Sequence, residues 1–208
     1  MSLVRKAATG LLGLSSLLVA ACHSRASHAS RVLARAKVYA AVLKEVRRDT
    51  AATWVIVDTL LPTHDVDAEQ HDKVIAGLPI RRGMLDAFLA VQRRPSDRFD
   101  TGMLPDARWT RVSMSQLDSL RLMARTDAAA APRTGRSDVF WRQWYRTFPG
   151  SGGYVILSPA SISTSDGVAV VQVRIACGPV CGETELRVLQ RDERGEWRTT
   201  GRVKLSES

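Results

Sequence analysis

The hydrophobic pattern of the last third of the chain constrains its fold more than any other sequence feature. From Ala169 to Cys177 apolar side chains recur at every second position, which places them on one face of a strand. The segments Thr164–Gly167 and Asp192–Gly195 bound the alternating runs, and the Asp-Gly pair in the first is a strong hairpin signal. We therefore expect a C-terminal antiparallel meander of four strands.

The other strands of this meander are expected at Tyr154–Ser158, around Leu186 and Val188, and near the C-terminus. In the last of these, apolar or neutral residues alternate with basic and polar ones, so we expect one buried face. That expected face carries Trp197, Thr199, Val203 and Leu205.

Helical spacing dominates the earlier part of the chain. Ser30 is expected to cap a helix that runs to about Asp49, and Met84–Gln92 has the spacing of a second helix. Between them, the β-branched run Trp54–Val57 predicts a buried strand that joins the same sheet. Residues 62–82 are ambiguous, and the part from about Asp65 to Ala76 fits a short helix.

Two further helices are expected before the meander. Ser113 and Gln116 form a capping box for a helix to about Arg125, and the Ala-rich residues 126–136 are expected to be a mobile loop. Ser137 is expected to cap an aromatic helix that ends at Pro149–Gly150. The prediction is thus an α+β fold for a single domain, residues 31–208, with helices on one face of the sheet.

The start of the chain has the layout of a secretory signal. Arg5 and Lys6 precede a short apolar stretch, and Val19-Ala20-Ala21-Cys22 matches the lipobox position by position. Residues 1–21 therefore resemble the signal peptide of a bacterial lipoprotein precursor. The resemblance implies acylation of Cys22, cleavage before it and acylation of the new amine, and several acyl chains are what stable membrane retention requires.

Removal of 21 of the 208 residues leaves 187, enough for one domain with a sizeable core. Residues 22–30 contain no large apolar side chain after the cysteine and are expected to be a flexible tether. The sorting rule of enteric bacteria retains lipoproteins with Asp after the cysteine in the inner membrane. His23 stands there instead, so we expect an outer-membrane protein that faces the periplasm.

The chain is basic, with 30 Lys and Arg against 21 Asp and Glu. Its arginine pairs are scattered and not interleaved with aromatic residues, so the pattern gives no nucleic-acid interface. The expected partner is the lipid bilayer through acylated Cys22, together with an envelope protein or small ligand. No cofactor is expected.

Cys177 and Cys181 enclose the turn Gly178-Pro179-Val180. With Cys22 acylated they are the remaining pair in an exported chain, which favours a disulfide. A redox-active pair is an alternative, although its spacing differs from that of thioredoxin-like motifs. A metal site is another, although two cysteines supply half a zinc shell.

Residues 140–200 resemble a group of uncharacterised exported proteins of environmental bacteria. The similarity rests on Tyr145–Gly153, the motif Cys-Gly-x-x-Cys-Gly at 177–182, and Gly195-Glu196-Trp197. The group usually has an aromatic residue after the first strand of this region, where this chain has Ser158–Ile162. The resemblance implies export and brings no assigned activity.

Two candidate sites for chemistry remain. His64, Asp67 and His71 would share one face of a helix, but their spacing matches no recognised metal site, so no metal is predicted. Asp58 ends a buried strand and is either an acid-base group or a contact at the sheet rim. No nucleophile, base and orienting group can be assembled from the sequence, so no catalytic residue is assigned.

The sequence therefore favours a membrane-tethered, non-catalytic binding or envelope-structural domain. The alternative is an envelope hydrolase or ligand-processing enzyme that uses a pocket between the sheet and the aromatic helix 140–148.

Overall fold

The computed structural model describes residues 30–46, 52–61, 74, 76–93, 99, 104, 108–130 and 136–207. The chain divides into two compact units, residues 1–36 and 37–208. In the first unit the described residues, 30–36, are helical. The features described below belong to the second unit.

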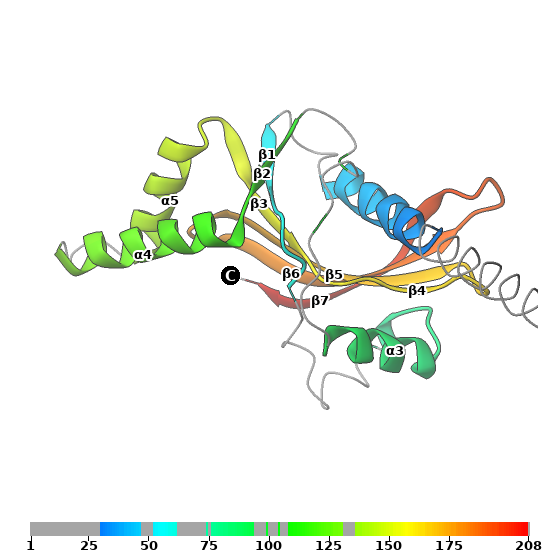
Figure 1. Ribbon diagram of the computed structural model, residues 1–208. Helices are drawn as coiled ribbons and strands as arrows, with labels where there is room; N and C mark the ends of the chain where they lie inside the picture. Colours follow the sequence, from blue (N-terminus) through cyan, green and yellow to red (C-terminus); the bar gives the residue numbers. More distant parts are fainter. Residues whose placement is uncertain are drawn as a thin grey trace, which may run out of the picture. The chain divides into compact units, whose positions relative to one another are not determined.

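The second unit contains one seven-stranded sheet with the order β2-β1-β3-β5-β6-β7, to which β4 is added by pairing with β5 (Figure 1). Strand β1 is parallel to both β2 and β3, whereas the pairs from β3 to β7 are antiparallel. The strands are β1 Thr53–Val57, β2 Trp109–Val112, β3 Ser151–Leu157, β4 Ser161–Ser163, β5 Val168–Gly178, β6 Cys181–Arg191 and β7 Trp197–Glu207.

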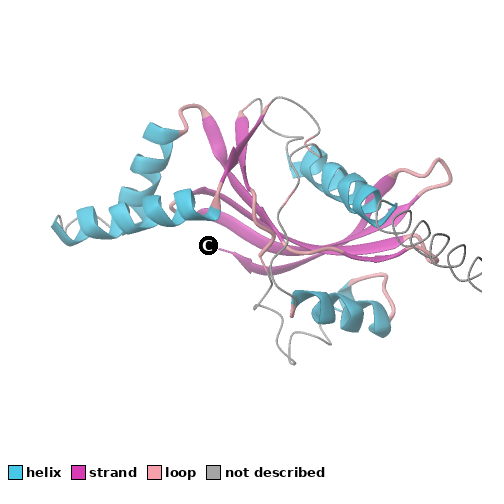
Figure 2. Cartoon of the chain, in the orientation of Figure 1, coloured by secondary structure: helices cyan, strands magenta, loops and turns pink. Residues whose placement is uncertain are grey.

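These strands confirm an α+β fold and extend the predicted sheet (Figure 2). The four strands of the meander are β3, β5, β6 and β7, and β1 joins the same sheet, as expected. The expectation of five strands is wrong because β2 and β4 add two more. Both are short, and β2 mixes two buried with two exposed residues, so neither produces a long alternating pattern.

The longer helices among the described residues of this unit are residues 37–46, α3 Arg82–Gln92, α4 Met114–Ala130 and α5 Arg136–Thr147. The predicted capping box is present, since the backbone N–H of Gln116 donates to Ser113 Oγ at 3.2 Å and that of Ser113 donates to Gln116 Oε1 at 2.9 Å. The aromatic helix ends before Gly150, which has φ +73°. This conformation favours glycine and suits the end of a helix.

Two helix boundaries differ from the prediction. Residues 126–130 belong to α4 and not to a loop, because alanine is the strongest helix former and Ala124 and Ala128 are buried on the packed side of the helix. Helix α5 begins at Arg136, so Ser137 lies in its first turn and not at its cap. Of the short helix expected over 65–76, only Val74 and Ala76 are described, and both are helical.

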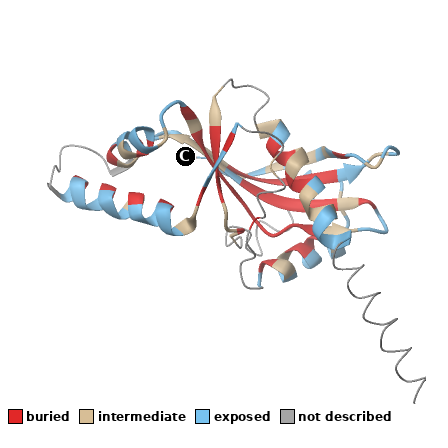
Figure 3. Ribbon diagram, turned by 45° about the horizontal axis from the view of Figure 1, so that its top comes forward, coloured by how far each residue is buried: buried red, intermediate tan, exposed pale blue. Residues whose placement is uncertain are grey.

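Helices cover both faces of the sheet, which corrects the expectation of one covered face (Figure 3). On the first face, helix 37–46 packs through Val38, Tyr39, Val42 and Leu43 against a cluster that includes Ile56 and Val171. On the second face, α4 and α5 pack against β1 and β3. Helix α3 packs against β5 and β6 on the second face through Leu85 and Phe88.

Strand β7 changes the face that it buries midway along its length. Trp197 packs in the first-face cluster, whereas Val203 and Leu205 pack on the second face. The register shifts between these residues, since Leu189 pairs with Thr199 and Val188 pairs with Gly201, which leaves Thr200 as a bulge. The predicted single alternating face for residues 197–205 is therefore wrong.

Among the described residues, no helix has the length and apolar character that crossing a bilayer requires.

Candidate functional site

The β5–β6 hairpin ends in the cysteine turn that the sequence singled out. The structure places the sulfurs of Cys177 and Cys181 at bonding distance, with their Cα atoms 5.1 Å apart. Cys177 is half-buried, Cys181 is exposed, and Val180 between them is 87% exposed. The structure thus brings the two cysteines of the predicted pair together at the tip of the β5–β6 hairpin.

Side-chain and backbone contacts hold the base of this tip. The hydroxyl of Tyr145 on α5 donates to the carbonyl of Cys177 at 3.0 Å, and desolvation raises the pKa of that phenol. Across the sheet Gly153 has φ +131°, and a Cβ there would lie 2.0 Å from the carbonyl oxygen of Ala176. Glycine is required because the backbones of β3 and β5 approach too closely for a side chain.

Trp141 and Trp144, two of the aromatic residues of α5, are buried in the core. Trp144 is fully buried, lies 4.9 Å from Tyr154 between ring centroids, and donates its indole N–H to Ser151 Oγ at 3.0 Å. Trp141 stacks on Tyr154 with a centroid distance of 5.9 Å. Ring-to-ring contacts therefore pack these two side chains against Tyr154 of β3.

Asp58 occupies the sheet rim. Its backbone N–H donates to Val112 at 2.9 Å and its carbonyl accepts from Phe99 at 2.7 Å. Its carboxylate accepts from the hydroxyl of Thr59 at 3.1 Å. Of the two sequence interpretations, this arrangement fits the rim contact.

The remaining predicted site residues lie outside the described part of the chain. These are Cys22 with the preceding signal segment, and the cluster of His64, Asp67 and His71. Among the described residues, no group of three or more His, Cys, Asp or Glu side chains could hold a metal ion.

A buried ionic cluster joins helix 37–46 to β6 and β7, and the sequence pattern did not reveal it. Arg187 is only 2% exposed, pairs with Glu185 on its own strand, and donates to the carbonyl of Val42 at 3.3 Å. Glu45 accepts from the N–H of Thr199 at 3.4 Å and lies 3.6 Å from Arg187. Arg202 donates at 2.5 Å to Glu45 Oε2, the same oxygen that lies 3.6 Å from Arg187. The buried carboxylate of Glu185 and the partly buried one of Glu45 thus face two guanidinium groups.

The charged side chains of this cluster are paired with one another, and charge can be buried at tolerable cost only when it is paired. Arg187 and Glu185 are two residues apart on β6 and hence share a face. This spacing was the one sequence signal for an Arg–Glu pair on β6. It does not indicate that the pair is buried, because charged residues on strands usually face solvent.

Two hollows lie near the end of the sheet where the β4–β5 and β6–β7 turns meet. The larger, about 640 Å³, lies between α3 and these strands, with Ile80, Met84 and Val168 among its apolar lining and Arg81 and Asp166 among its polar lining. A hollow of this volume falls within the range of small-ligand sites.

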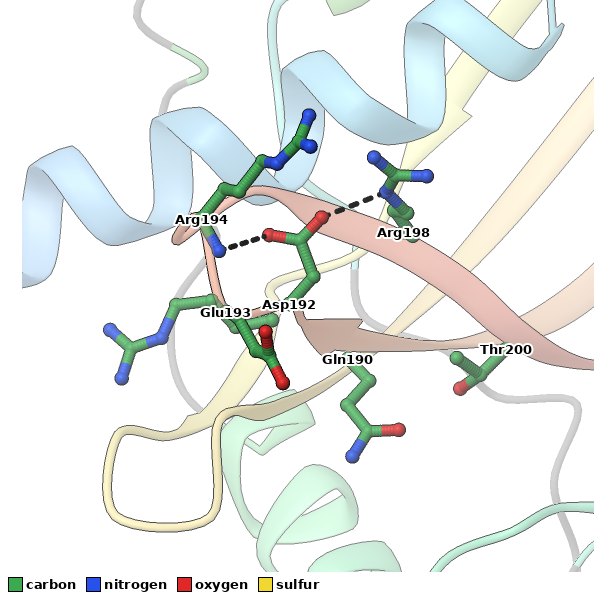
Figure 4. A pocket seen from close by; sticks show the side chains of 7 residues that line it. Gln190, Asp192, Glu193, Arg194, Arg198 and Thr200 are labelled. Carbon is green, nitrogen blue, oxygen red and sulfur yellow. Dashed lines mark hydrogen bonds and ion pairs between the residues drawn. The ribbon is translucent and has the colours of Figure 1, made fainter.

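The second hollow, about 560 Å³, surrounds the β6–β7 turn and is rich in charge (Figure 4). Asp192 pairs with Arg198 at 2.9 Å and accepts from the backbone N–H groups of Glu196 at 2.9 Å and Arg194 at 3.0 Å. The bond from Glu196, with smaller contributions from the other two, lowers the pKa of Asp192. Gln190 lines both hollows, so they are neighbours on the two sides of this residue.

Comparison with known proteins gives no relative from which a site could be transferred. No family model, no curated protein and no solved structure matches the chain.

Proposed function

We propose that this chain is an exported lipoprotein, held to the membrane through acylated Cys22, whose folded domain binds a ligand or partner and does not catalyse a reaction. The observation that carries the proposal is the placement of Cys177 and Cys181 at disulfide distance. Disulfides persist in oxidising compartments and are rare in the cytosol. The lipobox at residues 19–22 is an independent sequence signal for the same compartment.

Support for binding over catalysis comes from how the candidate groups are used. The Asp58 carboxylate is engaged at the sheet rim by Thr59, and the rings of Trp141 and Trp144 fill the interface between α5 and the sheet. The hollows near the sheet end instead present apolar surface and arginines, which suit binding.

The lipid anchor is tested by metabolic labelling with a fatty acid in a bacterial host that processes lipoproteins. The wild-type chain should incorporate label and sediment with the outer membrane. Cys22→Ser should incorporate none and leave the membrane fraction or persist as an uncleaved precursor. The double variant Cys177→Ser/Cys181→Ser is the matched control, because it removes two cysteines and should still be labelled. Equal label in wild type and Cys22→Ser would refute the anchor.

A further inference from the structure

The two neighbouring hollows that Gln190 lines differ in character. The part beside α3 offers an apolar wall made by Ile80, Met84 and Val168. The part around the β6–β7 turn is lined mainly by charged side chains. A ligand that occupied both parts would be amphipathic.

The lining carries more unsatisfied positive than negative charge. Arg81, Arg191 and Arg194 have no hydrogen-bonded or ion-paired side-chain partner in the described part of the chain, and all three are exposed. Two of the acidic lining residues already have side-chain partners. Asp192 is paired with Arg198, and Asp166 accepts a hydrogen bond from the Ser163 hydroxyl at 2.8 Å. Only Glu193 remains as a carboxylate without such a contact in these hollows.

We propose that the two neighbouring hollows together bind a single-chain anionic amphiphile that spans Gln190. Its alkyl chain would lie against the apolar wall beside α3, and its carboxylate or phosphate head would pair with the unpartnered arginines. Guanidinium groups bind these anions in a bidentate manner, and burial of the alkyl chain supplies the non-directional part of the affinity. The inference rests on the proposed binding role and adds the site and the ligand class.

Gly83 provides a way to block the apolar part without disturbing the core. It lines the hollow beside α3, and a Cβ added to it would meet no heavy atom within 4 Å. Gly83→Leu therefore adds a branched side chain at a lining position of the hollow, without a clash at its Cβ, and also improves helix propensity. Ala90→Leu is the matched control, because Ala90 is exposed on the same helix and does not line the hollow.

The charged part is tested by the double variant Arg191→Gln/Arg194→Gln. Its matched control is Arg142→Gln/Arg146→Gln, which removes the same charge from exposed positions on α5 that line neither hollow.

The measurement is calorimetric titration of the full chain carrying Cys22→Ser, so that no acyl chain is attached to the protein. The probes are dodecyl phosphate, dodecyl maltoside and dodecyltrimethylammonium, each below its micelle concentration. Dodecyl phosphate should bind at one site per chain and more tightly than the neutral or cationic probe. Gly83→Leu and Arg191→Gln/Arg194→Gln should each weaken its binding about tenfold or more, while both controls bind like the parent.

Each other outcome counts against the inference. If dodecyl phosphate does not bind, an anionic amphiphile is not the ligand. If the cationic probe binds equally well, the arginines do not select the head group. Equal affinities of Gly83→Leu and Ala90→Leu place any binding elsewhere. None of these results bears on fatty-acid labelling at Cys22, so failure of this site and failure of the proposed lipid anchor are distinguishable.

Discussion

At the scale of single residues, Gly153 leaves less room for a side chain than the other glycines in the described part of the chain. Its φ of +131° is rarely adopted by other residues, and the 2.0 Å approach of a Cβ to the Ala176 carbonyl involves backbone on both sides. Neither side can move without separating β3 from β5.

Gly153→Ala should therefore lower the free energy of unfolding by more than about 3 kcal/mol, the size of a severe core defect. Gly150→Ala is the control, since it has a positive φ of 73° but open space around its Cβ, and should cost only about 1–2 kcal/mol. Urea denaturation of both variants measures the difference. Similar losses would show that the close approach is not what requires glycine at position 153.

The burial of Arg187 could not be predicted from the sequence pattern. Its side chain is 2% exposed, and its guanidinium lies near the carboxylates of Glu185 and Glu45. Removing one partner of a buried pair leaves uncompensated charge.

We expect Arg187→Ala to lower the free energy of unfolding by about 3–5 kcal/mol. Arg198→Ala breaks the exposed pair with Asp192, where the arginine side chain is 64% exposed, and should cost less than about 1 kcal/mol. The two variants are compared by chemical denaturation. A loss at Arg187 as small as that at Arg198 would mean that the buried cluster contributes nothing beyond a surface pair.

At the scale of elements, the β5–β6 hairpin and α4 show two kinds of local stabilisation. The cysteine pair closes a short loop at the hairpin tip, so its effect on the entropy of the unfolded chain is small. The capping box of α4 satisfies two backbone groups at the start of a long helix.

The double variant Cys177→Ser/Cys181→Ser should lose about 2 kcal/mol, the value for a loop of this length. For a domain of this size the melting temperature should fall by roughly 4–8 °C. Thermal melting of the wild-type chain in its oxidised and reduced forms provides the comparison. A much larger fall would mean that the pair holds more than the hairpin tip, and efficient reduction of insulin by the reduced protein would contradict a purely structural role.

Ser113→Ala should lower the free energy of unfolding by about 1 kcal/mol, because one first-turn N–H of α4 loses its acceptor. Ser119→Ala is a suitable control, since that hydroxyl bonds to the Ser115 carbonyl within the helix and caps nothing. Equal effects of the two substitutions in urea denaturation would contradict the capping role.

The sequence predicted an element well where a few neighbouring residues favour a single local conformation. The capping box at Ser113 and Gln116, the Asp-Gly turn and the alternation from Ala169 to Cys177 are such cases. Strand β2 was missed because four residues with two exposed side chains carry too little periodicity. The bulge at Thr200 was missed because a register shift leaves no mark in an alternating sequence.

At the scale of the whole sheet, the sequence could not show how the helices are distributed. A buried parallel strand such as β1 is apolar on both faces, which indicates two covered faces but not which helix covers each one. Helix 37–46 covers one face and α3, α4 and α5 cover parts of the other. The hollows also depend on this arrangement, since α3 contributes one wall and the turns of distant strands contribute the rest.

An exported, acylated protein should have no free thiol among its three cysteines, because Cys22 carries an acyl chain and Cys177 is bonded to Cys181. The most direct test is intact mass spectrometry of the protein extracted from membranes and alkylated while unfolded and unreduced. We expect a chain that begins at Cys22, carries acyl groups and takes up no alkyl label. A chain that begins at Met1, or one that takes up label at Cys177 and Cys181, would contradict the account.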